Sequence, residues 1–275
     1  MADPQEIAEM YDLKTTRTGL NRSLAEGDGL FFNHNGLVLP GETLEMYERS
    51  ITDEKSRLER LHEIEQNLVR FGILYLGTPT EGMIGLDAGC GGGESGIMIH
   101  RSFGSTIEGF TLSPEQARYG NGAAENYGCS DKVRFHVGDM LNLERPKGSY
   151  DFIWVCESTE HAADLDAMFR EFNRVAKSLS RLVIIAWCAV DPKLKEVVDN
   201  HYLTDIHRFD EYLESAQRQG WNLAEHVDLT GMTAPYWELR SRSENGTGAE
   251  EFMYSGFRDK GIEYHLLAFD KQTYC

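Results

Sequence analysis

Residues 87–93, with the sequence D-A-G-C-G-G-G, restrict the fold of this chain more than any other stretch. The apolar run at residues 83–86 predicts a buried strand before them, and residues 95–101 predict a helix after them. A strand, a glycine turn and a helix N-terminus form a cradle for a nucleotide-like ligand, because glycines let the ligand approach the backbone closely. A tight turn without a ligand is the alternative, but three alternating glycines are costly without such an approach.

The spacing of the glycines narrows the choice of ligand. The pattern here is D-x-G-x-G-x-G, whereas dinucleotide sites use G-x-G-x-x-G with an acidic residue about 20 positions later. An acidic residue ahead of the first glycine suits a ligand with a cationic amino-acid end and no pyrophosphate. S-adenosylmethionine (SAM) is such a ligand, so the motif predicts a SAM site.

The rest of the chain alternates between strand and helix patterns, which predicts an α/β fold with a mostly parallel sheet. We expect strands at residues 106–110, 133–137, 150–156 and 181–187, and helices at 113–127 and 164–177. Helices at 193–202 and 208–219, a strand at 223–229, a mostly helical stretch at 235–258 and a strand at 262–269 follow. The sequence therefore predicts a seven-stranded Rossmann-like sheet with a helical insertion after the fifth strand.

Residues 1–80 are expected to form a lid and a helical segment packed on a core that spans residues 81–275. Residues 1–20 are polar without a clear period, and we expect them to be poorly ordered on their own. Aromatic, amide and histidine side chains crowd into D-G-L-F-F-N-H-N-G-L-V-L at residues 28–39, which is either a lid over a ligand or a structural aromatic turn. Residues 44–76 have the spacing of one long helix or two.

Composition excludes several classes of partner. The formal net charge of −18 argues against nucleic acid and against an anionic membrane surface. With no signal peptide and no apolar run near the length of a membrane span, we expect a cytoplasmic protein. The five cysteines form no C-x-x-C pair and should be free thiols. No histidine pair has zinc-ligand spacing.

Polar residues stand at the ends of four predicted strands, where ligands of such sheets bind. Asp87 and the glycines should hold the methionine part of SAM, and Asp139 should accept from the adenine amino group while Met140 packs on the ring. Thr111 and Gln116 occupy the positions expected to bind the ribose. The full set of residues predicted to bind the cofactor is Asp87, Gly89, Gly91, Thr111, Leu112, Gln116, Asp139 and Met140.

Glu157, in C-E-S-T-E-H, follows the fourth strand, where a methyl acceptor should lie. Its carboxylate is either a general base or a cap of the following helix. Glu160 and His161 fit a helix start and outward-facing roles. We expect no direct protein ligand to a metal; any metal should be Mg²⁺ held by the phosphates of an acceptor.

The chain resembles the bacterial prenyl diphosphate C-methyltransferases over roughly residues 21–269. The resemblance rests on D-G-L-F-F-N-H-N-G, D-A-G-C-G-G-G, H-R-S-F-G-S-T-I-E-G-F-T-L-S, C-E-S-T, D-I-H-R-F-D-E-Y-L and V-D-L-T-G-M-T-A-P-Y-W-E-L-R. The first and last segments are the specific ones, since they lie outside the generic SAM core. The T-L-S-x-x-Q piece is shared with cyclopropane fatty acid synthases.

This resemblance implies methylation of an alkene, a tertiary carbocation, and removal of a proton by the glutamate of the E-S-T segment, which is Glu157 here. It implies Mg²⁺ and a homo-oligomer. It also implies that the substrate-binding residues are Asn21, Phe31, Phe32, His34, Asn35, Arg101, His207, Tyr236 and Trp237. Among these, Asn21, His34, Arg101 and His207 are expected near the diphosphate, and Tyr236 and Trp237 as walls of the pocket.

One departure leaves the acceptor open. The lid of the family reads D-G-L-Y-H-H-H-Y-G, and here Asn35 replaces the aromatic residue before the last glycine. Geranyl diphosphate methylated at C2 or at another carbon and isopentenyl diphosphate are all compatible with the motifs. Another small acceptor, such as an amine or a fatty-acyl alkene, and a SAM-binding regulator without activity are the further alternatives.

Overall fold

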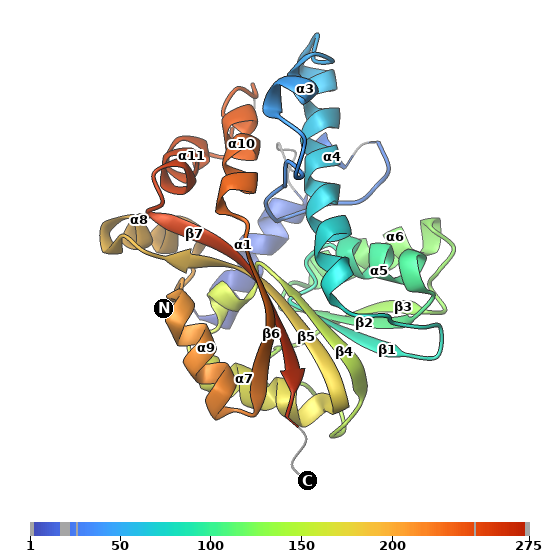
Figure 1. Cartoon of the computed structure of the whole chain (residues 1–275). Helices are drawn as coiled ribbons and strands as arrows, with labels where there is room; N and C mark the ends of the chain where they lie inside the picture. Colours follow the sequence, from blue (N-terminus) through green and yellow to red (C-terminus); the bar gives the residue numbers. More distant parts are fainter. Residues whose placement is uncertain (1–2, 17–22, 26, 245, 273–275) are drawn as a thin grey trace.

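The computed structural model describes residues 3–16, 23–25, 27–244 and 246–272. Asn21 and one of the five cysteines, Cys275, lie outside these ranges. The strands are β1 (Ile84–Ala88), β2 (Thr106–Thr111), β3 (Val133–Val137), β4 (Tyr150–Cys156), β5 (Ala176–Ala189), β6 (Trp221–Asp228) and β7 (Ile262–Lys271). All seven were predicted from the sequence, and they form one sheet (Figure 1).

The sheet has the order β3-β2-β1-β4-β5-β7-β6. The first five strands pair in parallel, and β7 runs antiparallel to both β5 and β6. The carboxyl ends of the parallel strands therefore meet at one edge. The chain reverses from β1 toward β2 on one side and β4 on the other, which is the place where sheets of this kind bind ligands.

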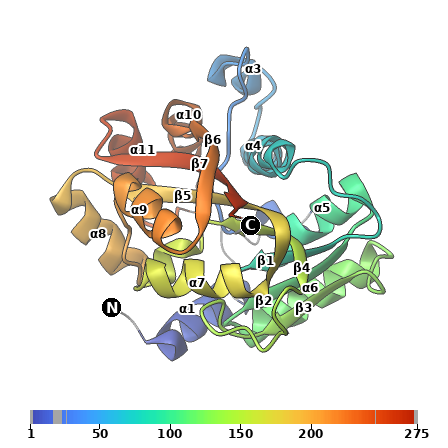
Figure 2. The same cartoon turned by 60° about the horizontal axis from the view of Figure 1, so that its bottom comes forward.

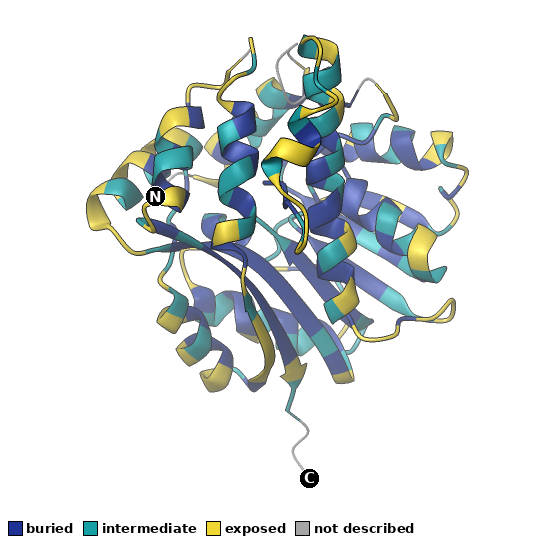
Figure 3. Cartoon of the chain, turned by 45° about the horizontal axis from the view of Figure 1, so that its top comes forward, coloured by how far each residue is buried: buried dark blue, intermediate teal, exposed yellow. Residues whose placement is uncertain are grey.

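Helices cover both faces of the sheet (Figure 2). On one face pack α4 (Glu54–Gly72), α5 (Glu94–Phe103), α6 (Pro114–Asn126), α10 (Thr230–Arg240) and α11 (Glu250–Arg258). On the other face pack α7 (Leu165–Val175) and α9 (Phe209–Arg218). Strand β4 shows the expected period of two, because Phe152 and Trp154 enter the first core and Ile153 and Val155 the second. Strands β1, β2, β4, β5 and β7 are buried along most of their length, whereas the edge strand β6 is largely exposed (Figure 3).

Local signals in the sequence set the helix ends. Ser113 caps α6 by accepting from the backbone N–H of Gln116 at 3.0 Å, as its spacing predicted. Residues 44–76 form two α-helices, α3 (Leu44–Glu48) and α4, with a 3₁₀ turn, η1 (Ile73–Tyr75), after them. The insertion after β5 contains α8 (Pro192–Tyr202) and α9. Among the described residues, no helix is long and apolar enough to cross a membrane.

Residues 4–16 belong to the segment expected to be poorly ordered on its own, and in the folded chain they form helix α1 (Pro4–Thr16). This helix docks on the N-terminus of α6, where Asp12 Oδ1 accepts from the hydroxyl of Ser113 and from the backbone N–H of Glu115 at 3.1 Å. Its stability comes from contacts with residues about 100 positions away, which a local pattern does not reveal. The domain boundary near residue 80 stays a prediction.

Candidate active site

A cavity of about 300 Å³ opens at the carboxyl ends of β1, β2, β3 and β4, and we name it the strand-end cavity. All eight residues predicted to bind the cofactor line it. They come from the ends of three strands, β1, β2 and β3, and from the first turn of α6, and Asp87 and Met140 are 53 positions apart, so the parallel sheet gathers them. Their individual contacts with SAM stay predictions.

Asp87 is the charged group at the floor of the strand-end cavity. Its side chain is only 2% exposed, and its Oδ2 has no hydrogen-bond partner. Burial raises the pKa of this carboxyl to about 7. An orphaned buried carboxylate oxygen fits a cationic ammonium group, which would restore the lost solvation.

Gly89 shows why this turn needs glycine. Its φ of +72° is in the left-handed region, and an added Cβ would lie 2.2 Å from Cβ of Ser158. Ser158 in turn donates to the carbonyl of Ala88 at 2.8 Å. The turn is therefore packed directly against the segment that follows β4, and the cradle fits a SAM-like ligand.

Two further features of the strand-end cavity bear on the cofactor. Thr111 Oγ1 donates to Oε1 of Gln116 at 2.6 Å, so the two residues predicted to bind the ribose form one unit. Glu94 also lines the cavity, and its buried Oε2 has no partner. Sequence reasoning missed Glu94, although its place at the start of α5, directly after the glycines, is a usable signal.

A second cavity, of about 630 Å³, lies beside the first, and we name it the lid cavity. It is lined by α1, by the lid segment (residues 28–39), by residues after β4 and by the C-terminal helices. The two cavities share five lining residues: Tyr11, Asn33, His34, Glu157 and His161. A cofactor in one cavity and an acceptor in the other would therefore meet at these side chains.

Glu157 stands at this junction, one residue beyond β4, with a strained φ of +47°. Its Oε1 accepts from the backbone N–H of Asn35 at 2.7 Å and from the hydroxyl of Tyr264 at 2.5 Å. Burial raises the pKa of the Glu157 carboxyl well above its usual range, and these two hydrogen bonds oppose that rise. The following 3₁₀ turn, η2 (Thr159–His161), has no side-chain cap, so the capping alternative is wrong.

Two cations, Lys14 and Arg240, line the lid cavity. The ammonium of Lys14 lies 4.9 Å from the ring centroid of Tyr11 and 5.2 Å from that of Tyr202. Burial lowers the pKa of Lys14 to about 8, and Arg240 adds to the effect. Sequence reasoning missed Lys14 because α1 itself was not expected.

Arg240 is buried and already has charged partners. It donates to the hydroxyl of Tyr236 at 2.7 Å and lies 3.8 Å from a carboxylate oxygen of Glu65 and 3.5 Å from one of Glu250. Two buried carboxylates thus offset one guanidinium. The lid cavity has cationic groups on α1 and α10, yet its surroundings carry little net positive charge.

The structure brings together part of the predicted substrate set. His34, Asn35, Tyr236 and Trp237 line the lid cavity, and Trp237 Nε1 donates to Oδ1 of Asn35 at 3.1 Å. The remaining described members lie among other side chains and do not appear in the lining of either cavity: Phe31, Phe32, Arg101 and His207.

Each of these four residues has a partner elsewhere. Phe31 packs edge-on against Tyr119, and Phe32 packs against His34 and His62. Arg101 is exposed above the ring of Tyr127, and His207 bonds through Nε2 to the carbonyl of Ala162 at 2.7 Å. Phe31, Phe32 and His207 are therefore part of the packing around the site, whereas Arg101 lies on the surface.

Glu160 and His161 do not face outward, although their spacing also allowed such roles. Glu160 is 2% exposed, lines the lid cavity, and accepts from the backbone N–H of Trp187 at 2.8 Å. His161 lines both cavities, donates through Nδ1 to the carbonyl of Leu203, and accepts through Nε2 from the hydroxyl of Tyr11 at 2.9 Å. Their fixed positions come from the β5 end and α1, which local spacing does not show.

No group of three or more His, Cys, Asp or Glu side chains that could hold a metal occurs within the described residues. The four described cysteines, Cys90, Cys129, Cys156 and Cys188, are free. A divalent cation in the lid cavity would therefore need most of its ligands from a bound molecule and water.

A family model described as a methyltransferase domain matches residues 86–178. The sheet order, the glycine cradle and this match define a SAM-dependent methyltransferase. Geranyl diphosphate 2-C-methyltransferase of Saccharopolyspora erythraea is 33% identical over 270 residues, which is 96% of this chain and 93% of that protein. The chain belongs to the geranyl diphosphate 2-C-methyltransferase family, whose members are C-methyltransferases.

Two further comparisons cover nearly the same length. The geranyl diphosphate 2-C-methyltransferase of Streptomyces coelicolor is 35% identical over 260 residues, which is 92% of this chain and 88% of that protein. A crystal structure of geranyl diphosphate C-methyltransferase from Streptomyces coelicolor, in complex with Mg²⁺, geranyl-S-thiolodiphosphate and S-adenosyl-L-homocysteine, superposes with a TM-score of 0.90 at 33% identity. It covers 98% of this chain and 97% of that chain.

Proposed function

We propose that this enzyme transfers the methyl group of SAM to an alkene carbon of geranyl diphosphate. The observation that carries the proposal is the junction of two cavities at Glu157, one lined by the cofactor motif and one by lid and C-terminal helices. SAM supplies the methyl group, which the alkene π electrons take as the carbon–sulfur bond breaks, leaving a tertiary carbocation on the acceptor. Glu157 then takes a proton from a neighbouring carbon, and the C–H electron pair restores the alkene.

The walls of the lid cavity suit a carbocation. Trp187, Tyr202, Tyr236 and Trp237 line it, and the negative faces of aromatic rings stabilise a nearby cation. Helix α1 lines one side of the lid cavity, and a side shielded from solvent limits the access of water, which would trap the cation as an alcohol. These features support methylation of an alkene over methylation of an amine, which forms no such intermediate.

The diphosphate would lie toward Lys14 and Arg240, away from Glu157 and Glu160. Because Glu65 and Glu250 already offset the charge of Arg240, these two cations do not balance a trianionic group. Mg²⁺ bound by the phosphate oxygens would supply the missing charge. Two related structures contain Mg²⁺ together with geranyl diphosphate or its thiolo analogue, which supports this role.

The size of the lid cavity supports a ten-carbon acceptor. Its volume of about 630 Å³ lies within the range of roughly 300–1,000 Å³ for sites of medium-sized ligands. Isopentenyl diphosphate, with five carbons, would leave much of that space to water beside a carbocation. Isopentenyl diphosphate is therefore the less favoured acceptor.

One observation leaves open which carbon of geranyl diphosphate receives the methyl group. Asn35, which replaces an aromatic residue of the family lid, lines the lid cavity beside Glu157 and is fixed by Trp237. A smaller side chain at this place changes how deeply the prenyl chain can lie, and so which double bond faces the methyl group. Methylation of geranyl diphosphate at a carbon other than C2 is the second candidate function.

The test is an incubation of the purified protein with SAM, Mg²⁺ and dimethylallyl, isopentenyl, geranyl or farnesyl diphosphate, read by mass spectrometry. With geranyl diphosphate we expect a product whose mass reflects the addition of one methyl group and the loss of one proton. Nuclear magnetic resonance of the product then shows which carbon carries the new methyl group. Turnover of none of the diphosphates, or preference for an amine or a fatty-acyl alkene, would contradict the proposal. We further propose that the protein is a homo-oligomer, which light scattering would test, and that it is located in the cytoplasm, which cell fractionation would test.

A further inference from the structure

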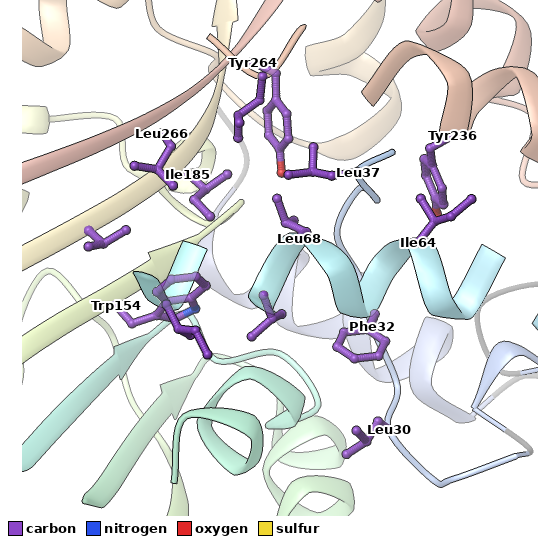
Figure 4. Close-up of a cluster of buried hydrophobic side chains, with 14 of the residues drawn as sticks. Leu30, Phe32, Leu37, Ile64, Leu68, Trp154, Ile185, Tyr236, Tyr264 and Leu266 are labelled. Carbon is purple, nitrogen blue, oxygen red and sulfur yellow. The ribbon is translucent and has the colours of Figure 1, made fainter. Parts of the chain in front are cut away.

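Two hydrogen-bond donors from distant parts of the chain converge on one oxygen of Glu157. The backbone N–H of Asn35 in the lid segment and the hydroxyl of Tyr264 on β7 both end on Oε1, at 2.7 and 2.5 Å. The side chain of Tyr264 projects from β7 toward the lid segment near Leu37 (Figure 4). Both bonds end on Oε1, and the side chain of Trp187, which lines the lid cavity, is a third group that favours the carboxylate.

Tyr264 itself is part of the core and is not among the described residues that line either cavity. Its backbone N–H donates to Thr230 Oγ1 at 2.9 Å, and its ring packs edge-on against Phe257. The backbone and the ring of Tyr264 are therefore each fixed by a contact, and the hydroxyl bonds to Glu157. Any effect of Tyr264 on the reaction has to act through that carboxylate.

We propose that Tyr264 is a positioning residue that, together with the docked lid segment, favours the carboxylate form of Glu157 and keeps it turned toward the acceptor. The inference rests on the proposed role of Glu157 as the base. It adds that Glu157 has both of its hydrogen-bond donors only when the lid segment donates the backbone N–H of Asn35. Proton removal is thereby tied to closure of the acceptor site.

The electrostatic reason is the balance between burial and hydrogen bonding. Burial favours the protonated carboxyl, whereas donors to Oε1 favour the carboxylate, which is the form that can act as a base. The titratable or charged groups that face Glu157 or share its cavities are Tyr264, Tyr11, Tyr202, Tyr236, Cys90, Cys156, Glu160, His34, His161, His201, Lys14, Arg240, Asp87, Asp139 and Glu94. Glu160 raises the pKa of Glu157 further, so removal of the Tyr264 hydroxyl leaves the acid form favoured over a wider pH range.

The lid segment is held where its N–H can serve Glu157. Thr233 Oγ1 donates to the carbonyl of Gly36 at 3.0 Å, and Trp237 Nε1 bonds Oδ1 of Asn35. A Cβ at Gly36 would lie 2.6 Å from a side-chain carbon of Ile64 and 2.8 Å from the ring of Tyr236. Gly36→Ala should therefore shift the lid away from Glu157 and repeat part of the effect of losing Tyr264.

The first test measures the carboxyl directly, without substrates. Infrared difference spectra are recorded across a pH series. The band of the protonated Glu157 carboxyl is identified as the one that is missing in Glu157→Gln. In Tyr264→Phe this band should persist to a pH higher by about one to two units, the equivalent of one lost hydrogen bond to a charged group. Tyr150→Phe is the matched control, because it removes a buried hydrogen bond of 2.7 Å from a tyrosine to Glu108, and it should leave the band unchanged.

The second test uses turnover of geranyl diphosphate. In Tyr264→Phe the acid limb of the kcat profile should move upward by the same one to two units, with the affinity for SAM unchanged and a larger share of alkene isomers or alcohol. An unshifted band in folded Tyr264→Phe, or a band that shifts equally in Tyr150→Phe, overturns the inference. If the band shifts as expected while the wild-type protein methylates no prenyl diphosphate, the positioning stands and the proposed function falls.

Discussion

The buried ammonium of Lys14 destabilises the ligand-free protein. Replacement of Lys14 should therefore have opposite effects on the stability of the fold and on the affinity for the diphosphate. Its ammonium lies over the rings of Tyr11 and Tyr202, and no ion pair with a carboxylate forms among the described residues. Burial lowers the pKa of Lys14 from 10.5 to about 8. We therefore expect Lys14→Met to stabilise the free protein and to weaken binding of the diphosphate.

The magnitude follows from the pKa. A displacement from 10.5 to about 8 corresponds to roughly 3 kcal/mol at full burial, and partial solvent access of Lys14 reduces this to about 1–2 kcal/mol. For a lysine whose pKa is lower in the folded state, the penalty is complete below about pH 8 and disappears as the pH rises toward 10.5. The gain in Lys14→Met should therefore be largest at neutral pH, with a rise of about 2–4 °C in Tm per kcal/mol.

Binding should change in the opposite direction. Loss of a charge-assisted hydrogen bond to phosphate costs roughly 1.5–3 kcal/mol, or about 10- to 150-fold in Kd. Calorimetry with Mg²⁺ and geranyl-S-thiolodiphosphate measures this, and titration near pH 8 in two buffers should show proton uptake by the wild-type protein only. Lys55→Met, at an exposed lysine, is the control. A Lys14→Met protein that is less stable than wild type at pH 7, or that binds the diphosphate with full affinity, would refute the reasoning.

Three other expectations concern the cofactor, the metal and the base. Asp87→Ala should weaken SAM binding by roughly 1.5–3 kcal/mol. In the wild-type protein, the affinity for SAM should decline as the pH falls below about 7, because the protonated carboxyl no longer attracts the ammonium group. Calorimetry checks both expectations, and an unchanged affinity in a folded variant would argue against the contact. Removal of divalent cations with EDTA should abolish turnover, and geraniol should not replace geranyl diphosphate; activity in either condition would exclude the diphosphate–Mg²⁺ role. Glu157→Gln should keep near-normal SAM affinity and lose roughly 10²–10⁴-fold in single-turnover rate, whereas a full rate per folded molecule would remove Glu157 from the chemistry.

The cofactor half of the site could be predicted from the sequence because its signals are local. The glycines after β1 specify a backbone shape within a few residues. The strands that follow have the short apolar runs of a parallel sheet, and such a sheet always brings its carboxyl ends together. Asp87, Thr111 and Asp139 therefore reached one cavity without any knowledge of the tertiary packing.

The acceptor half could be predicted only in part, because its geometry depends on long-range contacts. Tyr11 and Lys14 reach the lid cavity on a helix that is fixed by Ser113. Arg240 is held by Glu65, which lies 175 positions earlier in the chain. A polar helix with few apolar positions gives no periodic signal, so its order comes from tertiary contacts alone.

Arg101 and His207 illustrate the limit of motif matching. Both belong to segments that resemble the family, yet Arg101 covers the ring of Tyr127 at the far end of α5, and His207 holds the carbonyl of Ala162. A matched segment shows which residues recur, but the direction of each side chain depends on the helix face or loop that carries it. Glu160 shows the reverse, since its spacing suggested an exposed helix start and the β5 end buries it.

The division of the site between local and long-range structure has a chemical consequence. Methyl transfer needs the same SAM geometry for any acceptor. The residues predicted to set that geometry lie at the sheet edge, in the glycine motif and at the strand ends. The lid cavity, where we propose that the acceptor binds, is lined instead by α1, the lid segment and α10, and hydrogen bonds from Trp237 to Asn35 and from Thr233 to Gly36 join α10 to the lid. Substitutions in these segments can change which alkene lies beside Glu157 while the SAM cavity stays intact. Exchanges at Asn35 should therefore alter the methylated carbon before they alter SAM affinity.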